Sequence, residues 1–284
     1  MLKVLRDQTL ELLSRFGLTA EASIDEQQLI DSSSIKALID ASNPRASDTV
    51  LEIGPGAGNI TAELAARVTK VYAIEKNQKF IPLLEERFSN SANVEVIFGD
   101  ALTVYLPFFD VLVSNPPYAI TEAILHRLKR LKFRIASLIV PSTLAHSLTV
   151  DRGDPDYTKL TLEARLFYEI KIIREVKQES YHPKPKTTTF ILAMSPKEGL
   201  KPFEAVMKQL LNQRDKKSRN ALREAMISAS LVEFPSTKKA AKRAVDQLGL
   251  SEAILNERVA RLNLGEIMQV YEKLEHFSNL LNTI

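Results

Sequence analysis

Short apolar runs alternate with amphipathic helical patterns through the middle of this chain, and this alternation constrains its fold more than any other feature. Five strand-like runs cover residues 49–54, 70–75, 94–100, 109–115 and 136–141. Three helix-like segments lie between them, at residues 60–68, 78–88 and 121–131. Strands that alternate with helices form parallel sheets covered by helices on both faces. The sequence therefore predicts an α/β fold with a mostly parallel, Rossmann-like sheet.

The later part of the chain predicts an added hairpin and then a second domain. Two more strand-like runs, at 170–176 and 187–194, are joined by the turn-rich segment ESYHPKPK, and we expect them to add a hairpin to the edge of the sheet. After residue 196 only helical spacing remains, at 200–214, 216–229, 237–249 and 264–281. We therefore expect domains at 1–196, with an N-terminal helical extension, and at 197–284, a small all-α domain.

Composition excludes several classes of site. The 284 residues are 45% hydrophobic and 26% charged, as in ordinary soluble domains. The absence of cysteine excludes disulfides, cysteine-based zinc sites and a thiol nucleophile, and four scattered histidines argue against any metal site. The charged, amphipathic N-terminal segment lacks the apolar core of a signal peptide, and no apolar run is long enough to span a membrane. We expect a cytoplasmic protein without a membrane partner.

The positive charge is concentrated in the second predicted domain. Residues 197–284 contain 15 Lys and Arg against 11 Asp and Glu, a net charge of +4, whereas the whole chain has a net charge of +3. Within residues 208–243 the imbalance reaches ten basic against three acidic residues. A basic stripe confined to one region favours a polyanionic partner. On charge alone, a solvated helix face without any partner explains this stripe equally well.

The first strand-like run ends in LEIGPGAGN, in which glycines stand at 54, 56 and 58. Glycines at a strand-to-helix turn let the backbone adopt positive φ and approach a ligand closely. A dinucleotide-binding loop would need its third glycine at position 59, but Asn59 stands there. The pattern therefore predicts a nucleotide-like cofactor other than a dinucleotide.

This E-x-G-x-G-x-G pattern resembles the first motif of class I S-adenosylmethionine-dependent methyltransferases. In that family the glycine loop passes under the methionine and ribose of the cofactor. The second run should end in a carboxylate for the ribose hydroxyls, and KVYAIE supplies Glu75. The third should end in an acidic residue near the adenine, and VIFGD supplies Asp100. The resemblance implies S-adenosylmethionine contacts from Leu29, Glu52, Gly54, Gly56, Gly58, Glu75, Lys76, Asp100, Ala101 and Asn115.

The fourth run ends in SNPPY, where the two prolines end the strand because they cannot donate to a sheet. The stretch resembles the motif [DNS]-P-P-[YFW] of methyltransferases that act on planar amino or amide nitrogens. An adenine N6 lone pair is delocalised into the ring, so this nitrogen is a poor nucleophile. If Asn115 Oδ1 and the Pro116 carbonyl accept its N–H groups, they favour a more tetrahedral nitrogen in the transition state. Tyr118 can then stack on a base extruded from its helix.

The segment ESYHPKPK resembles the F-x-P-x-P-K segment of the rRNA adenine dimethyltransferases, the KsgA and Erm group. In that family an aromatic residue here forms the other wall around the target base, and Tyr181 holds its place. The stretches LLNQRDKKSRNAL and ERVARLNLGEIMQVYEKL resemble the family's basic helical segment and the end of the KsgA-type helical domain. The resemblance covers roughly residues 24–275, and the long helical domain favours the KsgA-like branch.

The resemblance implies S-adenosylmethionine-dependent dimethylation of adenine N6 in small-subunit rRNA, linked to ribosome assembly. It implies a monomer whose partner is rRNA within a small-subunit precursor. The catalytic residues would be Asn115, Pro116, Tyr118 and Tyr181. The RNA contacts would be Lys184, Lys186, Arg214, Lys216, Lys217, Arg219 and Arg223.

Departures from the family pattern keep two alternatives open. The N-terminal stretch DEQQLID lacks the family's glycine and aromatic, and three threonines, residues 187–189, replace its V-D-S/A. These departures favour a ribosome-assembly factor that transfers little or no methyl. The N-P-P-Y form, without the family's Leu, Val or Ile after the asparagine, also fits a protein-glutamine methyltransferase.

Three further side chains, Arg152, Asp154 and Tyr157, could contact RNA, although the capped start of a helix explains them equally well. His182, beside the predicted aromatic wall, is a titrating group that could shuttle a proton.

Overall fold

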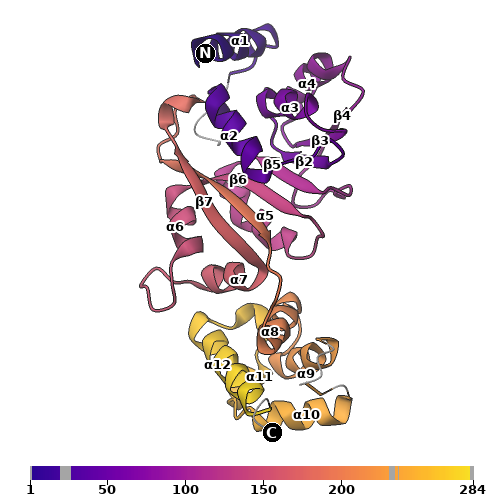
Figure 1. The fold of residues 1–284 in the computed structure, drawn as a ribbon, viewed down its shortest axis with the longest axis vertical. Coiled ribbons are helices and arrows are strands. Elements are labelled where there is room, and N and C mark those ends of the chain that lie inside the picture. The colour runs from indigo at the N-terminus through magenta and orange to yellow at the C-terminus, as the bar shows by residue number, and fades with distance from the viewer. Residues whose placement is uncertain (1, 20–26, 230–233, 236, 282–284) are drawn as a thin grey trace. The chain divides into compact units, whose positions relative to one another are not determined.

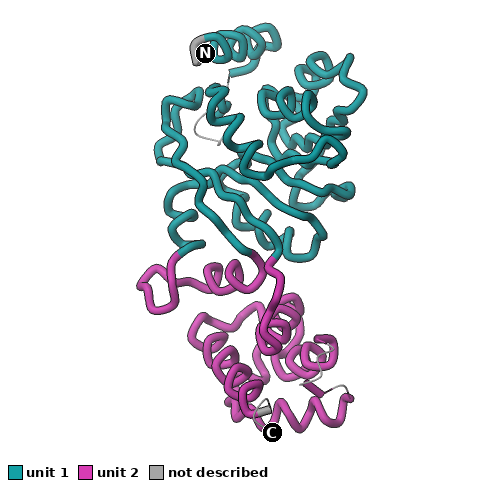
Figure 2. The backbone as a smooth tube through the Cα atoms, in the orientation of Figure 1, with its two compact units in different colours: residues 1–149, 169–196 teal, residues 150–168, 197–284 magenta. Residues whose placement is uncertain are grey.

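The computed structural model describes residues 2–19, 27–229, 234–235 and 237–281. The chain forms two compact units, coloured separately in Figure 2: residues 1–149 with 169–196, and residues 150–168 with 197–284. The predicted domain ranges stay a prediction. Like the predicted domains, the two units are divided after residue 196. They differ from the predicted domains in residues 150–168, which belong to the second unit.

The first unit is built on a seven-stranded sheet of order β4-β3-β2-β5-β6-β9-β7 (Figure 1). The strands β2 to β6 pair in parallel, and β9 runs antiparallel to β6. The expected α/β sheet is present, and β7 lies at its edge next to β9, as the predicted hairpin requires. The strands are β2 (Thr49–Ile53), β3 (Lys70–Glu75), β4 (Val94–Phe98), β5 (Val111–Ser114), β6 (Ile135–Pro141), β7 (Tyr168–Val176) and β9 (Thr189–Pro196).

The central strands read as continuous apolar runs because both of their faces are buried. All four residues of β5 and five consecutive residues of β6 are buried. Helices of this unit are α1 (Leu2–Arg15), α2 (Ser32–Ser42), α3 (Asn59–Ala65), α4 (Ile81–Phe88), α5 (Thr121–Leu128) and α6 (Ser142–Thr149). Parallel strands covered in this way place their carboxyl ends along one edge of the sheet, where α/β proteins bind ligands.

The helix α2, which the apolar pattern did not predict, packs on β5, β6 and β9. Its start is fixed by Asp31, whose carboxylate accepts hydrogen bonds from the backbone N–H groups of Ser33 and Ser34. The N-terminal amphipathic helix is present as α1. Its buried Leu13 belongs to one apolar cluster with Ala57 of the glycine loop and with Leu84 and Phe88 of α4.

A second, two-stranded sheet joins distant parts of the first unit. The strand β1 (Gln28–Leu29) pairs antiparallel with β8 (Tyr181–His182), so that Leu29 lies opposite Tyr181 and Gln28 opposite His182. This pairing brings the N-terminal segment to the ESYHPKPK segment, although about 150 residues separate them in the sequence.

The second unit is helical, as its spacing predicts. Its helices are α7 (Lys159–Phe167), α8 (Pro202–Asn212), α9 (Ser218–Ser228), α10 (Lys238–Gln247), α11 (Glu252–Asn256) and α12 (Leu264–Leu281). Within this unit α8 packs against α7, α9 and α12.

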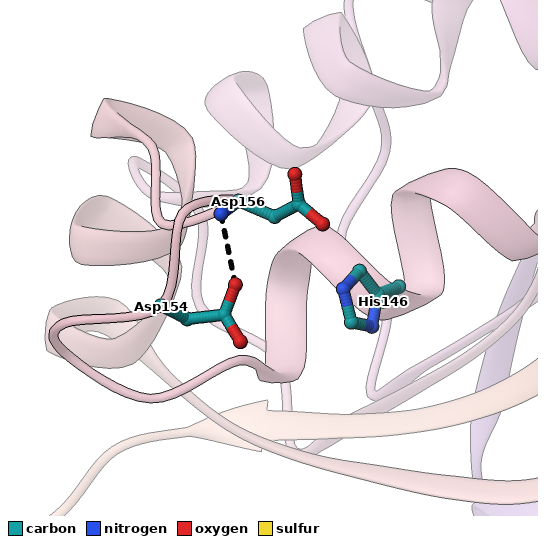
Figure 3. A group of neighbouring side chains, drawn as sticks. All are labelled: His146, Asp154 and Asp156. Atoms are coloured by element: carbon teal, nitrogen blue, oxygen red, sulfur yellow. Dashed lines mark hydrogen bonds between the residues drawn. The ribbon is translucent and has the colours of Figure 1, made fainter.

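The carboxylate of Asp154 stabilises the turn before α7. The backbone N–H of Asp156 donates to the Asp154 carboxylate over 2.8 Å (Figure 3, which also labels His146 of α6 in the first unit). Thr158 then caps α7 through a reciprocal pair of hydrogen bonds with Thr161. The capped helix start is therefore present, with Thr158 as the cap, and RNA contact by Arg152, Asp154 or Tyr157 stays a prediction.

Across the described ranges, none of the helices has both the length and the apolar character that a membrane crossing requires.

Candidate active site

Two cavities lie in the first unit where β2, β3, β4 and β5 end. The larger, of about 430 Å³, is lined by Ile53, Gly54, Ile74, Glu75, Lys76, Asn77, Gly99, Asp100, Ala101, Pro117 and Ile120. The smaller, of about 70 Å³, is lined by Gln27, Gln28, Leu29, Gly54, Pro55, Gly56, Asn59, Ile60, Glu75, Phe80, Asn115 and Pro117. Because Gly54, Glu75 and Pro117 line both, the cavities adjoin along the glycine loop. The sheet thus gathers three of the predicted motifs around one space.

The glycine loop has no room for side chains. Gly56 and Gly58 have φ of +54° and +82°, which L-residues rarely adopt. A Cβ on Gly56 would lie 2.4 Å from Oε1 of Gln28, and one on Gly58 would lie 2.8 Å from the ring of Phe88. Backbone conformation and close packing therefore both require glycine at these positions.

Side chains from outside the loop hold it in place. The backbone N–H of Ala57 donates to Gln28 Oε1 over 2.8 Å. The guanidinium of Arg87 donates to the Ala57 carbonyl and, over 3.0 Å, to Asn59 Oδ1. Burial lowers the pKa of Arg87 from its usual value, while the nearby Glu52 carboxyl acts in the opposite direction. Asn59 in turn donates to the Leu29 carbonyl over 3.0 Å, so the loop is tied to β1.

Glu75, at the end of β3, is buried between the two cavities. One carboxylate oxygen accepts from the backbone N–H of Gly56 over 3.2 Å, and the other accepts from that of Asn77 over 2.8 Å. These bonds fix the carboxylate at the cavity wall. Its oxygens keep further lone pairs, which suit it to accept hydrogen bonds from a diol.

Asp100 and Lys76 lie together on the wall of the larger cavity. Their side chains form an ion pair of 2.9 Å, and the backbone N–H of Leu102 donates to Asp100 over 2.8 Å. The hydrogen bond from Lys76 is the largest cause that holds the pKa of Asp100 below its usual value. Ala101 follows, and its carbonyl accepts from Arg127 over 2.5 Å. All three residues line the larger cavity, and their contacts with a cofactor stay a prediction.

Glu52 lies beneath the glycine loop, outside the lining of both cavities. It is fully buried, and one of its oxygens accepts from the Thr61 hydroxyl over 2.6 Å. Burial raises the pKa of Glu52 to about 8, and its Oε1 has no hydrogen-bond partner among the described residues. The predicted cofactor contact of Glu52 stays a prediction.

After β5 the SNPPY stretch continues without regular structure through Pro117 and then enters a 3-10 helix, Tyr118–Ile120. Ser114 anchors the stretch by donating to the Ile53 carbonyl over 2.5 Å. The side-chain amide of Asn115 donates to the Gln27 carbonyl over 3.4 Å, whereas its buried Oδ1 has no partner within the described part of the chain. Pro116 is buried, and Pro117 lines both cavities. An unfilled acceptor therefore lies beside the smaller cavity.

Tyr118 and Tyr181, the two aromatic residues predicted to enclose the target base, lie near each other. The Tyr181 hydroxyl pairs with Thr189 Oγ1 over 2.6 Å. The Tyr181 side chain is only 2% exposed, and this burial raises its pKa above the usual value, an effect to which the nearby hydroxyl of Tyr118 adds. Neither tyrosine is part of the cavity walls described above, so stacking on a base stays a prediction. Burial and the charge of Arg6 lower the pKa of His182, which favours its neutral form.

Ion pairs engage three of the predicted RNA contacts. In the first unit Lys184 pairs with Glu179 over 3.2 Å. In the second, Arg219 of α9 pairs with Asp246 of α10 and Glu252 of α11 over 2.9 and 2.5 Å, which gives this arginine a structural role. Lys216 pairs with Glu224. The remaining predicted contacts are exposed or half-buried: Lys186, Arg214, Lys217 and Arg223.

Sequence reasoning missed the residues that shape the site from a distance. Gln28, Arg87 and Arg127 hold the backbone around the cavities, but each is far in sequence from the group it contacts. For Gln28 a signal existed, because it stands in DEQQLID, where the aligned family motif differs. The two arginines are unremarkable members of amphipathic helices and gave no signal.

Comparison with known proteins agrees with this geometry. The chain matches the ribosomal RNA adenine dimethylase family over residues 18–257. It belongs to that family. A Pyrococcus abyssi relative of this dimethylase, named probable ribosomal RNA small subunit methyltransferase A, is 32% identical over 96% of the chain and 98% of its own length. A Thermococcus sibiricus relative of the same name is 31% identical over 94% and 96%.

Solved structures show the same fold at lower identity. A dimethyladenosine transferase from Plasmodium falciparum gives a TM-score of 0.59 at 24% identity, covering 87% of this chain and 97% of its own. The 23S rRNA methyltransferase ErmE gives 0.58 at 23% identity, covering 87% and 99%. The predicted class I methyltransferase fold is confirmed.

The residues present fit the cofactor of this family, S-adenosylmethionine. The cavity offers a loop with three glycines, a fixed carboxylate at Glu75 and an ion-paired Asp100. The chain is therefore an S-adenosylmethionine-dependent enzyme of the ribosomal RNA adenine dimethylase family, as the motifs predicted.

Proposed function

We propose that this dimethylase transfers two methyl groups to one adenine N6 of small-subunit rRNA. The observation that carries the proposal is the buried Oδ1 of Asn115, an acceptor without a partner among the described residues. A buried acceptor left unfilled costs free energy, so such groups mark sites that a ligand completes. An amino N–H is the complementary donor.

The residues of the larger cavity hold the cofactor, which supplies a methyl group on its sulfonium sulfur. Glu75 accepts hydrogen bonds from the ribose hydroxyls while its contacts to Gly56 and Asn77 keep it oriented. Asp100 accepts from the adenine amino group, with its carboxylate kept ionised by Lys76. The loop lets its backbone approach the cofactor closely at Gly54, Gly56 and Gly58, because these three residues carry no Cβ.

The SNPPY stretch acts on the target nitrogen. Asn115 Oδ1 and the Pro116 carbonyl accept the two N6–H bonds and favour a nitrogen whose lone pair points at the methyl group. The Asn115 amide is oriented for this by its donation to the Gln27 carbonyl. Such acceptors stabilise the transition state more than the ground state, which is the condition for catalysis. The proton leaves after transfer, so no strong general base is required.

The small-subunit target is supported by the relatives, whose names specify the small subunit and which align over nearly the whole chain. We further propose that the enzyme acts as a monomer on a small-subunit precursor. The basic region of the second unit is suited to rRNA phosphates. Phosphate contacts position RNA without reading its sequence, so the target adenines are selected elsewhere.

The second candidate is an assembly factor of the same fold with little transfer activity. The burial of Tyr181 favours it, because a base cannot stack on a covered ring. The partnerless Asn115 acceptor and the intact glycine loop argue for the enzyme.

The deciding experiment measures transfer of labelled methyl from S-adenosylmethionine to unmethylated small-subunit particles, followed by nucleoside analysis. We expect labelled N6,N6-dimethyladenosine with the wild type. Asn115→Ala should reduce the rate by about two to three orders of magnitude, as for loss of a transition-state hydrogen-bond partner. Asn90→Ala, at an exposed position of the same unit, is the matched control. Tight particle binding without labelled product would favour the assembly factor instead.

A further inference from the structure

The loop between β4 and β5 exposes two aromatic rings. Tyr105 is 86% exposed and Phe108 is 70% exposed. Their neighbours Leu106 and Phe109 are buried and anchor the loop. The two exposed rings therefore belong to an anchored segment, and their exposure is not explained by a lack of structure around them.

This loop lies along a basic segment, residues 127–134. The guanidinium of Arg127 donates to the carbonyls of Ala101 and Val104. The rings of Phe109 and Phe133 stack with centroids 6.2 Å apart. The backbone N–H of Arg134 donates to the Asp110 carbonyl over 2.8 Å, which is a third contact between the loop and the segment. The loop that carries the exposed rings and the segment that carries the cations are thus in contact at Arg127, Phe133 and Arg134.

The basic segment carries exposed cations in addition to those that form its contacts with the rest of the unit. It contains five Lys or Arg and no acidic residue. Arg127 is engaged with the loop backbone, and Arg134 pairs with Asp48 over 2.5 Å. Arg130 and Lys132 are both exposed. We call Tyr105, Phe108, Arg130 and Lys132 the aromatic–basic surface.

We propose that the aromatic–basic surface binds an unpaired stretch of the RNA substrate, as a contact separate from the methyl-transfer site. Cations that track the backbone, combined with aromatic rings on which bases stack, are what single-stranded nucleic-acid sites use. Tyr, Phe and Arg are also enriched in protein interfaces, whereas Lys is depleted there, so Lys132 is the side chain of this surface that a protein partner matches least. This inference rests on the proposed function in one respect, that the RNA is the enzyme's substrate.

The surface is linked to the cofactor site by one short loop. Asp100 and Ala101, at the start of the loop, line the larger cavity, and Tyr105 and Phe108 follow within eight residues. The hydrogen bonds from Arg127 hold both parts of the loop on α5. Cofactor affinity therefore reports whether a variant of the surface keeps the loop folded.

The test measures binding of the full chain to labelled single-stranded RNA and to an RNA duplex of equal length by fluorescence anisotropy across salt concentrations. Tyr105→Ala with Phe108→Ala should weaken single-strand binding by about thirtyfold or more, since each stacked base contributes about 1–3 kcal/mol. Duplex binding should change less than twofold. Arg130→Gln with Lys132→Gln should reduce the salt slope for single strands by about 1.4, at about 0.7 per phosphate contact.

Matched controls come from the edge strand β7. Ile172→Ala with Ile173→Ala removes exposed apolar side chains, and Lys171→Gln removes an exposed charge of the same unit. These variants should bind RNA like the wild type. Equal RNA affinity of the aromatic double variant and the wild type, with S-adenosylmethionine affinity retained, would overturn the proposal. So would sedimentation that shows the surface buried between two copies of the chain.

Failure of this inference and failure of the proposed function give different results. If the aromatic double variant methylates small-subunit particles with the wild-type KM, the surface has no role while the activity stands. If RNA binding depends on the surface but the wild type forms no dimethyladenosine, the surface stands and the activity does not.

Discussion

Glu52 should make this protein less stable as the pH rises through neutrality. Its carboxyl is fully buried, and its pKa is about 8 in the folded state against an ordinary 4.5. Between these two pH values the folded protein holds a proton that the unfolded chain releases. The contribution of Glu52 to the free energy of unfolding is therefore fully present below pH 4.5 and is lost as the pH approaches 8. The slope is at most about 1.4 kcal/mol per pH unit, or roughly 2–3 kcal/mol between pH 5.5 and 7.5.

The substitution Glu52→Gln removes the titrating group while keeping its shape. The variant retains an acceptor for the Thr61 hydroxyl, so we expect it to lie within about 1 kcal/mol of the wild type at pH 5.5. It should become the more stable of the two above pH 7.5, because the wild type then ionises a buried acid.

The assay is urea unfolding followed by circular dichroism at several pH values. Glu85→Gln, at an exposed position of α4, is the control and should show no pH-dependent difference. A difference between Glu52→Gln and the wild type that stays constant from pH 5.5 to 8 would refute the reasoning, since it would mean that Glu52 is ionised throughout.

Three shorter predictions test other contacts. Gly56→Ala should weaken S-adenosylmethionine binding by at least tenfold in calorimetry, because its Cβ would lie 2.4 Å from Gln28 Oε1 in a backbone with φ of +54°; unchanged affinity would contradict the loop geometry. Arg219→Gln should lower the melting temperature of the protein slightly and leave RNA affinity nearly unchanged, since this side chain is already ion-paired. Tyr181→Phe should cost about 1 kcal/mol of stability in urea unfolding through the loss of Thr189 as partner, and should retain methyl transfer; an unchanged stability would contradict this hydrogen bond.

The parts of the fold that were predicted correctly are those with local causes. Apolar runs such as the one ending at Ser114 are strands buried on both faces, and the hydrophobic pattern records this directly. The glycines at 56 and 58 record a local need for positive φ. The positions of Glu75 and Asp100 on one cavity wall could be predicted from the strand ends, because parallel strands end at one edge of a sheet.

The parts that could not be predicted depend on contacts between distant residues. The strands β1 and β8 have two residues each, too short for a periodic signal, and exist because Leu29 and Tyr181 pair across the fold. Arg219 reads as a phosphate contact in a basic run, but its partners Asp246 and Glu252 come from two other helices. Charge in a sequence does not show which cations are already engaged.

The departures from the family pattern are coherent when the contacts are considered together. A tyrosine at position 181, where the family motif has phenylalanine, brings a hydroxyl that must be paired if it is buried. Thr189, one of the three threonines that replace the family residues, is the partner of that hydroxyl. Gln28, in the stretch that lacks the family's aromatic, supplies an acceptor to the backbone of the glycine loop at Ala57. Tyr181, Thr189 and Gln28 are thus each paired within the described part of the chain. The same pairing would stabilise an assembly factor, so the choice between the two candidates rests on the partnerless Oδ1 of Asn115 and on the methyl-transfer assay.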